Sequence, residues 1–429
     1  MTEKNTWSFK NKDNLTPIHE LPDPFIKPDG NRVQNKSEWP QQRAYLKAML
    51  EHYFYGSIPP PPKHTVGEVL FSRPVYGGKA IAETVRITFD NNISFNADII
   101  RPCKEGKVPV ITWNQFKGRH GSPAEEDIVC NRGYAIAEFD KEQLAADSGA
   151  AFSGPLAKAY PEYGWGTIAM WSWGHSRIAD YLATTDYADM NKLVATGHSR
   201  GGKVAMCAAI FDERFAVCAA NGSGCGGAGC LRFLGGRLGE GTALCETAGS
   251  IMDAFPFWFA DEFGRYGARS TEYCHANCNE MSGDLQAAAK MFSGFKVGTT
   301  KDEDKLPFDL HFLRALIAPR ALITTDGLSD AWANTFGTQI TWRAAQEVFN
   351  FLDVPGNNAM CFRDGPHEYQ LTDWATVADF CDMVFFDKKP KTNIVMFEAP
   401  TAQSPQAKLM SMMDWRKDKL HYTWEMPSI

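Results

Sequence analysis

The sequence predicts an α/β fold, with a mostly parallel central sheet covered by helices on both faces. From about residue 108 onward, apolar runs of strand length alternate with helix-like segments, and the links between them are short. These runs are apolar throughout instead of at every second residue, which is typical of strands buried on both faces. Such alternation favours parallel strands joined by helices, so we expect a single domain over residues 1–429.

The first hundred residues show a different pattern. Residues 1–40 are polar and rich in proline, and they predict an extended arm across the surface. Residues 41–54 have helical periodicity, which the proline run SIPPPPKHT ends. Residues 80–89 and 94–101 then predict an antiparallel pair of strands that opens the sheet.

The strands and helices expected after this pair alternate along the chain. The expected strands are 108–115, 133–140, 193–198, 215–221, 320–326 and 358–362, and the expected helices are 165–183, 201–211, 336–351 and 372–386. Between about residues 231 and 307 the pattern loosens into loops and short helices rich in Phe and Trp. We expect this insertion to line the substrate cleft as a lid or platform.

Composition limits the partners and the compartment. The formal charge is −7 and no dense basic patch is visible, so a nucleic-acid partner is not expected. Apolar runs all fall short of the roughly 20 residues of a membrane helix. The N-terminus has no apolar signal segment, and the odd count of 11 cysteines leaves at least one thiol free. We expect a cytoplasmic protein as written, or a secreted one if a leader has been removed; the oligomeric state stays open.

The pentapeptide Gly197-His198-Ser199-Arg200-Gly201 matches the G-x-S-x-G pattern between an expected strand and an expected helix. In such a turn the nucleophile is strained, and side chains at the two glycine positions would collide with neighbouring elements. The start of the helix supplies N–H groups for a developing oxyanion. We therefore expect Ser199 to be the nucleophile of a serine esterase of the α/β-hydrolase type; the alternative is a chance strand-to-helix turn.

A serine nucleophile needs a histidine base and an acid that orients it. His367 is the best candidate base, because it lies in the loop DGPHE just after an expected strand. His198 is too close in sequence to reach Ser199 and is expected to pack or hydrogen-bond under the turn. Asp330 gives the order Ser, Asp, His expected for this fold. Asp326, at the end of the preceding strand, remains an alternative acid.

These motifs resemble carbohydrate esterase family 15, the glucuronoyl esterases. The similarity rests on GHSRGGK at residues 197–203, on NGSGCGGAG, LPFDLHFLRALIAPRALI and DAWAN, and on the N-terminal LPDPF, WPQQRAYL and YGSIPPPP, so it spans nearly the whole chain. The resemblance implies an enzyme that cleaves the ester between 4-O-methyl-glucuronic acid on xylan and lignin alcohols. It also implies that no metal or other cofactor takes part.

The resemblance implies further site residues. Arg200 would point its guanidinium at the oxyanion, while Lys203 and Glu246 would contact sugar hydroxyls and Trp332 would line the sugar site. Each has a structural alternative: an ion pair for Arg200, a solvated side chain for Lys203, a helix cap for Glu246 and a core position for Trp332. A backbone N–H of loop 116–121 is a further candidate for the oxyanion site.

The chain departs from the fungal members at two positions. They carry Cys where His198 stands, and the resemblance implies that this chain lacks the disulfide which that cysteine forms. They carry the catalytic acid as Glu where this chain has Gly222. The acid must therefore come from elsewhere, and Asp330 matches the pattern of many bacterial members.

Other functions stay open from the sequence alone. An α/β-hydrolase esterase of another specificity, acting on acetyl-xylan or aryl esters, would keep the same triad. A carbohydrate-binding relative without activity would not need the nucleophile and the base. The group Cys274, His275 and Cys278 supplies too few ligands for a metal site.

Overall fold

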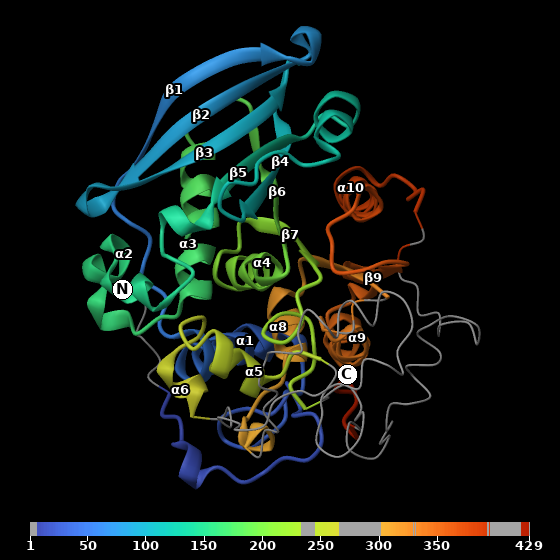
Figure 1. Ribbon diagram of the computed structural model, residues 1–429. Coiled ribbons are helices and arrows are strands. Elements are labelled where there is room, and N and C mark those ends of the chain that lie inside the picture. Colours follow the sequence, from blue (N-terminus) through green and yellow to red (C-terminus); the bar gives the residue numbers. More distant parts are fainter. Residues whose placement is uncertain are drawn as a thin grey trace, which may run out of the picture.

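In the residues that the structure describes, the central sheet has nine strands in the order β1-β2-β3-β5-β4-β6-β7-β8-β9 (Figure 1). The computed structural model describes residues 7–232, 245–265, 302–328, 330, 332–392, 394 and 422–428. The strands in the described residues are β1 Thr65–Val75, β2 Ala80–Phe89, β3 Ile93–Pro102, β4 Val108–Gln115, β5 Ala135–Asp140, β6 Ala188–His198, β7 Phe215–Asn221, β8 Ala321–Gly327 and β9 Asn358–Arg363.

Every neighbouring pair from β5 to β9 is parallel, as the sequence predicts. The opening of the sheet differs, because β1, β2 and β3 form a three-stranded antiparallel unit and not a pair. Strand β1 lies at the edge and is mostly exposed, and its register shifts between Val69 and Phe71. None of its residues is buried, so the alternation of buried and exposed residues from which a strand is predicted is absent.

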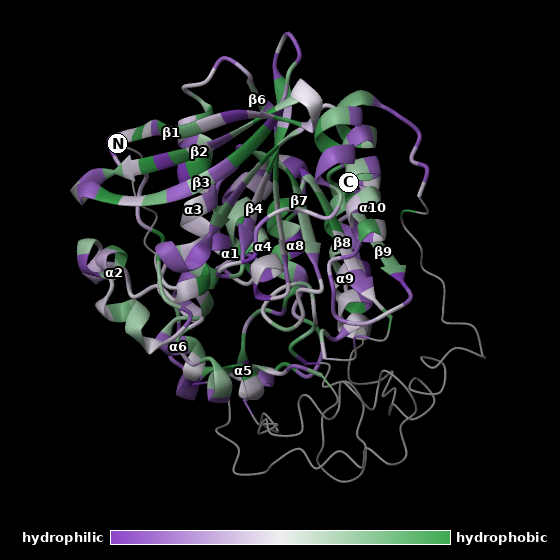
Figure 2. Ribbon diagram, turned by 45° about the horizontal axis from the view of Figure 1, so that its top comes forward, coloured by the Kyte–Doolittle hydropathy of each residue, from purple (hydrophilic) through white to green (hydrophobic). Residues whose placement is uncertain are grey.

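Helices cover both faces of the sheet and enclose two cores (Figure 2). The α-helices in the described residues are α1 Trp39–Leu50, α2 Pro155–Ala159, α3 Thr167–Leu182, α4 Arg200–Phe211, α5 Ala248–Ala254, α6 Asp261–Gly264, α8 His311–Ile317, α9 Thr335–Phe351 and α10 Leu371–Phe386. Within β4, Val110 belongs to the core under α3 and α4, whereas its neighbour Ile111 belongs to the core under α10. The uniformly apolar strands are thus explained by two buried faces.

The N-terminal arm is extended apart from short 3-10 turns, and Phe25 and Val33 anchor it with fully buried side chains. The insertion expected at about residues 231–307 lies largely outside the described residues, as do Cys274, His275 and Cys278. Among the helices that the structure describes, none is long and apolar enough to cross a membrane.

The turn from β6 into α4 carries the serine and is held by close backbone contact. A side chain added at Gly197 would clash with the carbonyl of Gly201, and one added at Gly201 would meet the side chain of Asn114. Asn114, on the neighbouring strand β4, donates its amide to the carbonyl of Gly201 at 3.0 Å. The two glycines of the pentapeptide are therefore required by packing, which confirms the reason given for them.

We expect Gly197→Ala to lower the free energy of unfolding by about 1–3 kcal/mol, because the added methyl forces β6 and α4 apart. Ester hydrolysis should fall about 100-fold, since a displacement of about 1 Å in a catalytic group has that effect. Urea unfolding and initial rates check both effects. Gly149→Ala is the control, because its added Cβ meets nothing within 4 Å. Wild-type activity in Gly197→Ala would contradict the packing argument.

Candidate active site

Ser199 lies in a strained turn at the carboxyl end of β6. Its φ of +59° and ψ of −126° place it in a region that residues with side chains rarely adopt. Its N–H donates to the carbonyl of Asn221 on β7 at 2.9 Å, and its own carbonyl accepts the N–H of Gly202 at 2.8 Å. These bonds hold the strained backbone, which is the expected arrangement for an exposed nucleophile at a helix start.

His367 and Asp330 come together from the loops that follow β9 and β8. The imidazole Nδ1 lies 2.5 Å from the Asp330 carboxylate, which is nearly fully buried. The second carboxylate oxygen accepts the N–H of Ala333 at 3.0 Å, so the acid is held on both sides. Because a carboxylate only accepts, Nδ1 carries the proton and Nε2 is left as the basic nitrogen.

Asp326 does not share this position. Its side chain is 1% exposed, and neither carboxylate oxygen has a hydrogen-bond partner in the described residues. Burial, and then repulsion from Asp330, raises the pKa of Asp326 well above its ordinary value. Of the two aspartates left open by the sequence, only Asp330 contacts the histidine in the described structure.

Gly222 lies directly against the catalytic histidine. A Cβ added at Gly222 would come within 3.2 Å of two atoms of the His367 ring. The backbone there has a φ of +49°, which favours glycine. Gly222 thus offers no carboxylate, and the space beside it is filled by the imidazole of His367.

His198 packs beside the same ring. The centroids of His198 and His367 are 4.5 Å apart, and Nδ1 of His198 donates to the side-chain oxygen of Asn221 at 2.6 Å. Asn221 is oriented by its amide, which donates to Thr325. Burial lowers the pKa of His198 to about 3, so it stays neutral beside the base. His198 both packs and hydrogen-bonds under the turn, as expected.

Arg200 is held by a carboxylate and by aromatic rings. Its guanidinium donates to Asp147 at 2.5 Å and lies 4.8 Å from the ring centroid of Trp258 and 5.0 Å from that of Phe255. Asp147 also accepts the indole N–H of Trp258 at 2.9 Å, and it lies 3.6 Å from the buried ammonium of Lys141. This arrangement fixes the guanidinium of the residue that follows the nucleophile in the sequence.

Lys203 and Glu246 form a buried ion pair one turn further along α4. Their charged atoms are 2.6 Å apart, and the ammonium also donates to the carbonyl of Ser223 at 2.7 Å. The N–H of Glu246 donates to the carbonyl of Trp332 at 2.9 Å. Glu246 does not cap α5, because Thr247 is the N-cap residue. The three candidate sugar contacts, Lys203, Glu246 and Trp332, are thus linked by an ion pair and a backbone hydrogen bond. Lys203 is buried, not solvated.

A cavity of about 610 Å³ opens beside the histidine. It is lined by Trp113, Gln115, Phe116, Arg119, Gly121, Pro123, His198, His367, Glu368, Tyr369, Gln370, Leu371 and Thr372. Loop 116–121 therefore forms one wall, facing the loop that carries His367. The lining mixes aromatic rings with a few polar groups, as small-molecule sites do.

Comparison with known families agrees with this geometry. The chain matches the sequence profile described as "Glucuronyl esterase, fungi" over residues 85–283 and 269–353. These segments cover more than half of the 429 residues. The chain belongs to the glucuronyl esterase family. It is a carboxylic ester hydrolase, and the resemblance inferred from its motifs is confirmed.

Relatives of this glucuronoyl esterase come from prokaryotes and fungi. "Carbohydrate esterase MZ0003", from an unknown prokaryotic organism, is 26% identical over 85% of this chain and 90% of its own. The "4-O-methyl-glucuronoyl methylesterase" of Podospora anserina is 28% identical over 81% of this chain and 65% of its own.

A solved structure agrees with the fold. The carbohydrate esterase family 15 glucuronoyl esterase from Caldicellulosiruptor kristjansonii superposes with a TM-score of 0.70 at 28% identity, over 92% of this chain and 98% of its own. The predicted α/β-hydrolase fold is thereby confirmed.

We expect Asp330→Asn to lower kcat by about 10⁴-fold, because the histidine then loses the acid that fixes its tautomer and stabilises its cation. Asp326→Asn should lower it less than tenfold, since that carboxyl contacts no catalytic group. Both variants replace an aspartate by asparagine, so their steady-state rates of hydrolysis of one ester can be compared directly. The assignment of the acid fails if Asp326→Asn is the more damaging change.

Asp326→Asn should also change how stability depends on pH. A buried carboxyl with a raised pKa holds its proton in the folded state above the ordinary pKa of about 3.9, so the free energy of unfolding falls as pH rises through this window. Asparagine removes this dependence. Urea unfolding between pH 5 and 8 should show an advantage of the variant that grows with pH. A stability difference between the variant and wild type that does not change with pH would contradict the raised pKa of Asp326.

Proposed function

We propose that this enzyme hydrolyses esters of glucuronic acid or 4-O-methyl-glucuronic acid by acyl transfer, with Ser199 as nucleophile, His367 as base and Asp330 as acid. The observation that carries the proposal is the 2.5 Å contact between His367 and the buried Asp330. The His367–Asp330 pair lies at the same edge of the sheet as the strained serine, and His367 lines the cavity. An α/β-hydrolase places its catalytic groups at this edge.

The reaction proceeds in two steps. Ser199 Oγ attacks the ester carbonyl while His367 Nε2 takes its proton, and the resulting imidazolium then protonates the departing alcohol. Water next attacks the acyl-enzyme with the same nitrogen as base, which releases the uronic acid and restores the serine. Asp330 keeps Nδ1 protonated and stabilises the imidazolium in both steps. His198 stays neutral, so it adds no positive charge beside that cation.

Arg200 supplies the oxyanion site in this proposal. Its backbone N–H lies at the start of α4, directly after the nucleophile, where this fold provides one oxyanion donor. Its guanidinium is fixed by Asp147 and by the faces of Trp258 and Phe255. A donor held in advance needs no rearrangement as charge develops, and one such donor is worth about 3 kcal/mol in the barrier.

The Lys203–Glu246 pair and Trp332 are proposed to bind the sugar. A buried ammonium and a carboxylate offer both donors and acceptors to hydroxyl groups. Arg200 and Lys203 place two cationic donors on this side of the nucleophile, each paired with a carboxylate, and such donors suit an acid product. The curated relatives named as 4-O-methyl-glucuronoyl methylesterases support the uronate assignment. Attached xylan and lignin alcohols are proposed as the natural context.

An esterase with another acyl preference is the alternative that the triad itself permits. Acetyl esters need no sugar contacts, so they would be cleaved without help from the Lys203–Glu246 pair. Comparing benzyl glucuronate with benzyl acetate and p-nitrophenyl acetate separates the two specificities. The two benzyl esters share one alcohol, so any difference in their rates arises from the acyl group.

We expect kcat/KM for benzyl glucuronate to exceed that for benzyl acetate, and Ser199→Ala to lower the glucuronate rate by at least about 10⁴-fold. The matched control is Ser72→Ala on the edge strand β1, which should keep the wild-type rate. Activity confined to the acetates would retain the triad and overturn the uronate assignment. Equal rates in wild type and Ser199→Ala would overturn the assignment of Ser199 as the nucleophile.

A further inference from the structure

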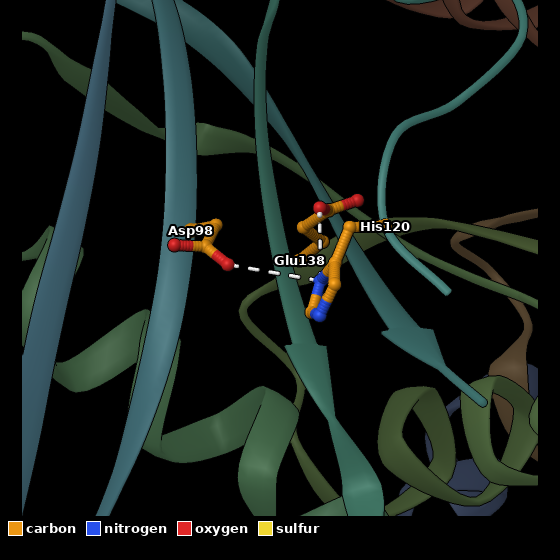
Figure 3. Close-up of side chains that lie close together, drawn as sticks. All are labelled: Asp98, His120 and Glu138. Carbon is orange, nitrogen blue, oxygen red and sulfur yellow. Dashed lines mark ion pairs between the residues drawn. The ribbon is translucent and has the colours of Figure 1, made fainter. Parts of the chain in front are cut away.

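Three potential metal ligands, Asp98, His120 and Glu138, lie close together (Figure 3). Asp98 on β3 and Glu138 on β5 are direct partners in the antiparallel register, so their side chains share one face of the sheet. His120 reaches them from loop 116–121. One ligand atom from each of the three side chains lies within 4.8 Å of the others.

The distances fit a shared metal ion better than direct hydrogen bonds. His120 Nδ1 lies 3.7 Å from Asp98 Oδ2 and 3.5 Å from Glu138 Oε1. A hydrogen bond between such groups would measure about 2.7–3.2 Å. Two ligands that each lie about 2.1 Å from a tetrahedral Zn²⁺ are separated by about 3.4 Å. The spacing from His120 to each carboxylate is therefore close to that of two ligands around one ion, and the three ligand atoms together lie within 4.8 Å of one another.

The far sides of both carboxylates are already held. Thr84 donates its hydroxyl to Asp98 Oδ1 at 2.6 Å, and Gln115 donates its amide to Glu138 Oε2 at 2.5 Å. The N–H of Gly121 lies 3.1–3.2 Å from the two Glu138 oxygens. Outer hydrogen bonds of this kind orient metal ligands, and here those from Thr84 and Gln115 leave Oδ2 and Oε1 nearest the imidazole, while Oε1 also accepts the N–H of Gly121.

Charge also favours a cation at this position. Two carboxylates directly opposite one another on neighbouring strands repel. Glu138 is only 5% exposed, so little solvent screens its side of the pair. Asp98 and His120 have side chains that are 41% and 51% exposed, which leaves a route for an ion and room for bound water.

We propose that Asp98, His120 and Glu138 bind one divalent transition-metal ion of the Zn²⁺ class, and that this ion braces loop 116–121. One imidazole and two carboxylates form a mixed nitrogen and oxygen set that suits such an ion, with water completing the coordination. Phe116, Arg119 and Gly121 of the same loop line the cavity beside the catalytic histidine. The ion takes no part in acyl transfer; it fixes a wall of the substrate site.

Binding of Zn²⁺ alone to the chelator-treated full chain tests the site by isothermal titration calorimetry. Wild type should bind one more equivalent than His120→Ala or Asp98→Asn, and Asp98→Asn keeps the shape of the side chain. The matched control is His19→Ala, because His19 lies 3.5 Å from the single carboxylate Asp304. All four proteins contain the same cysteine thiols, so Zn²⁺ binding by thiols contributes equally to each titration. Equal Zn²⁺ binding by the four would overturn the proposal and leave His120 as a plain ion-pair partner.

Trypsin cleavage gives a second readout that needs no ester. Lys117 and Arg119 are exposed in the loop. Zn²⁺ should slow cleavage after both residues at least about tenfold in wild type and His19→Ala, but not in His120→Ala. Mass spectrometry identifies the cut sites. Unchanged cleavage in wild type despite a bound ion would overturn the bracing role, and neither result depends on whether the enzyme prefers glucuronate.

Discussion

The close approach of β6 and α4 at Ser199 is the constraint on which the site depends. The chain reverses there within a few residues, and the space between Gly197 and Gly201 admits no side chain. Asn114 joins the two elements through its amide. The serine therefore stands at a fixed height above the sheet, and the groups that act on it come from loops beyond other strands. A shift of this turn would change the distance from the serine to each of these groups.

Two differently charged environments flank the nucleophile. On one side Asp330 is the carboxylate paired with His367, and the neighbouring His198 is kept neutral by burial. On the other side, Arg200 and Lys203 are each paired with a carboxylate, and both lie near the ring of Trp258. Buried ion pairs of this kind add little stability, because removing both charges from water is costly. Their value here is that they hold cations in place for a reaction that develops negative charge.

Much of this arrangement could be predicted, because buried parallel strands and the serine turn leave strong local signals. Strands β2, β4 and β7 have the predicted bounds. Strand β1 escaped prediction because an exposed, bulged edge strand has no buried face to mark it. Asp147 was also missed, since its partner Arg200 is distant in sequence and an aspartate after a strand is common in turns. The choice between Asp330 and Asp326 required coordinates, because Asp326 lies at the end of β8 and Asp330 follows that strand by only a few residues.

The residues of the site follow one another in the sequence in the same order as their strands lie in the sheet. Ser199 follows β6, Gly222 follows β7, Asp330 follows β8 and His367 follows β9, and these strands are consecutive neighbours. A chain that ended after β7 would contain both partners of the Ser199–Asn221 bond, yet it would have no base. The chain therefore becomes able to catalyse the reaction only once β9 and the following His367 have been added. Hydrolysis thus reports that the whole parallel sheet has assembled, and a partly synthesised chain cannot cleave an ester by this route.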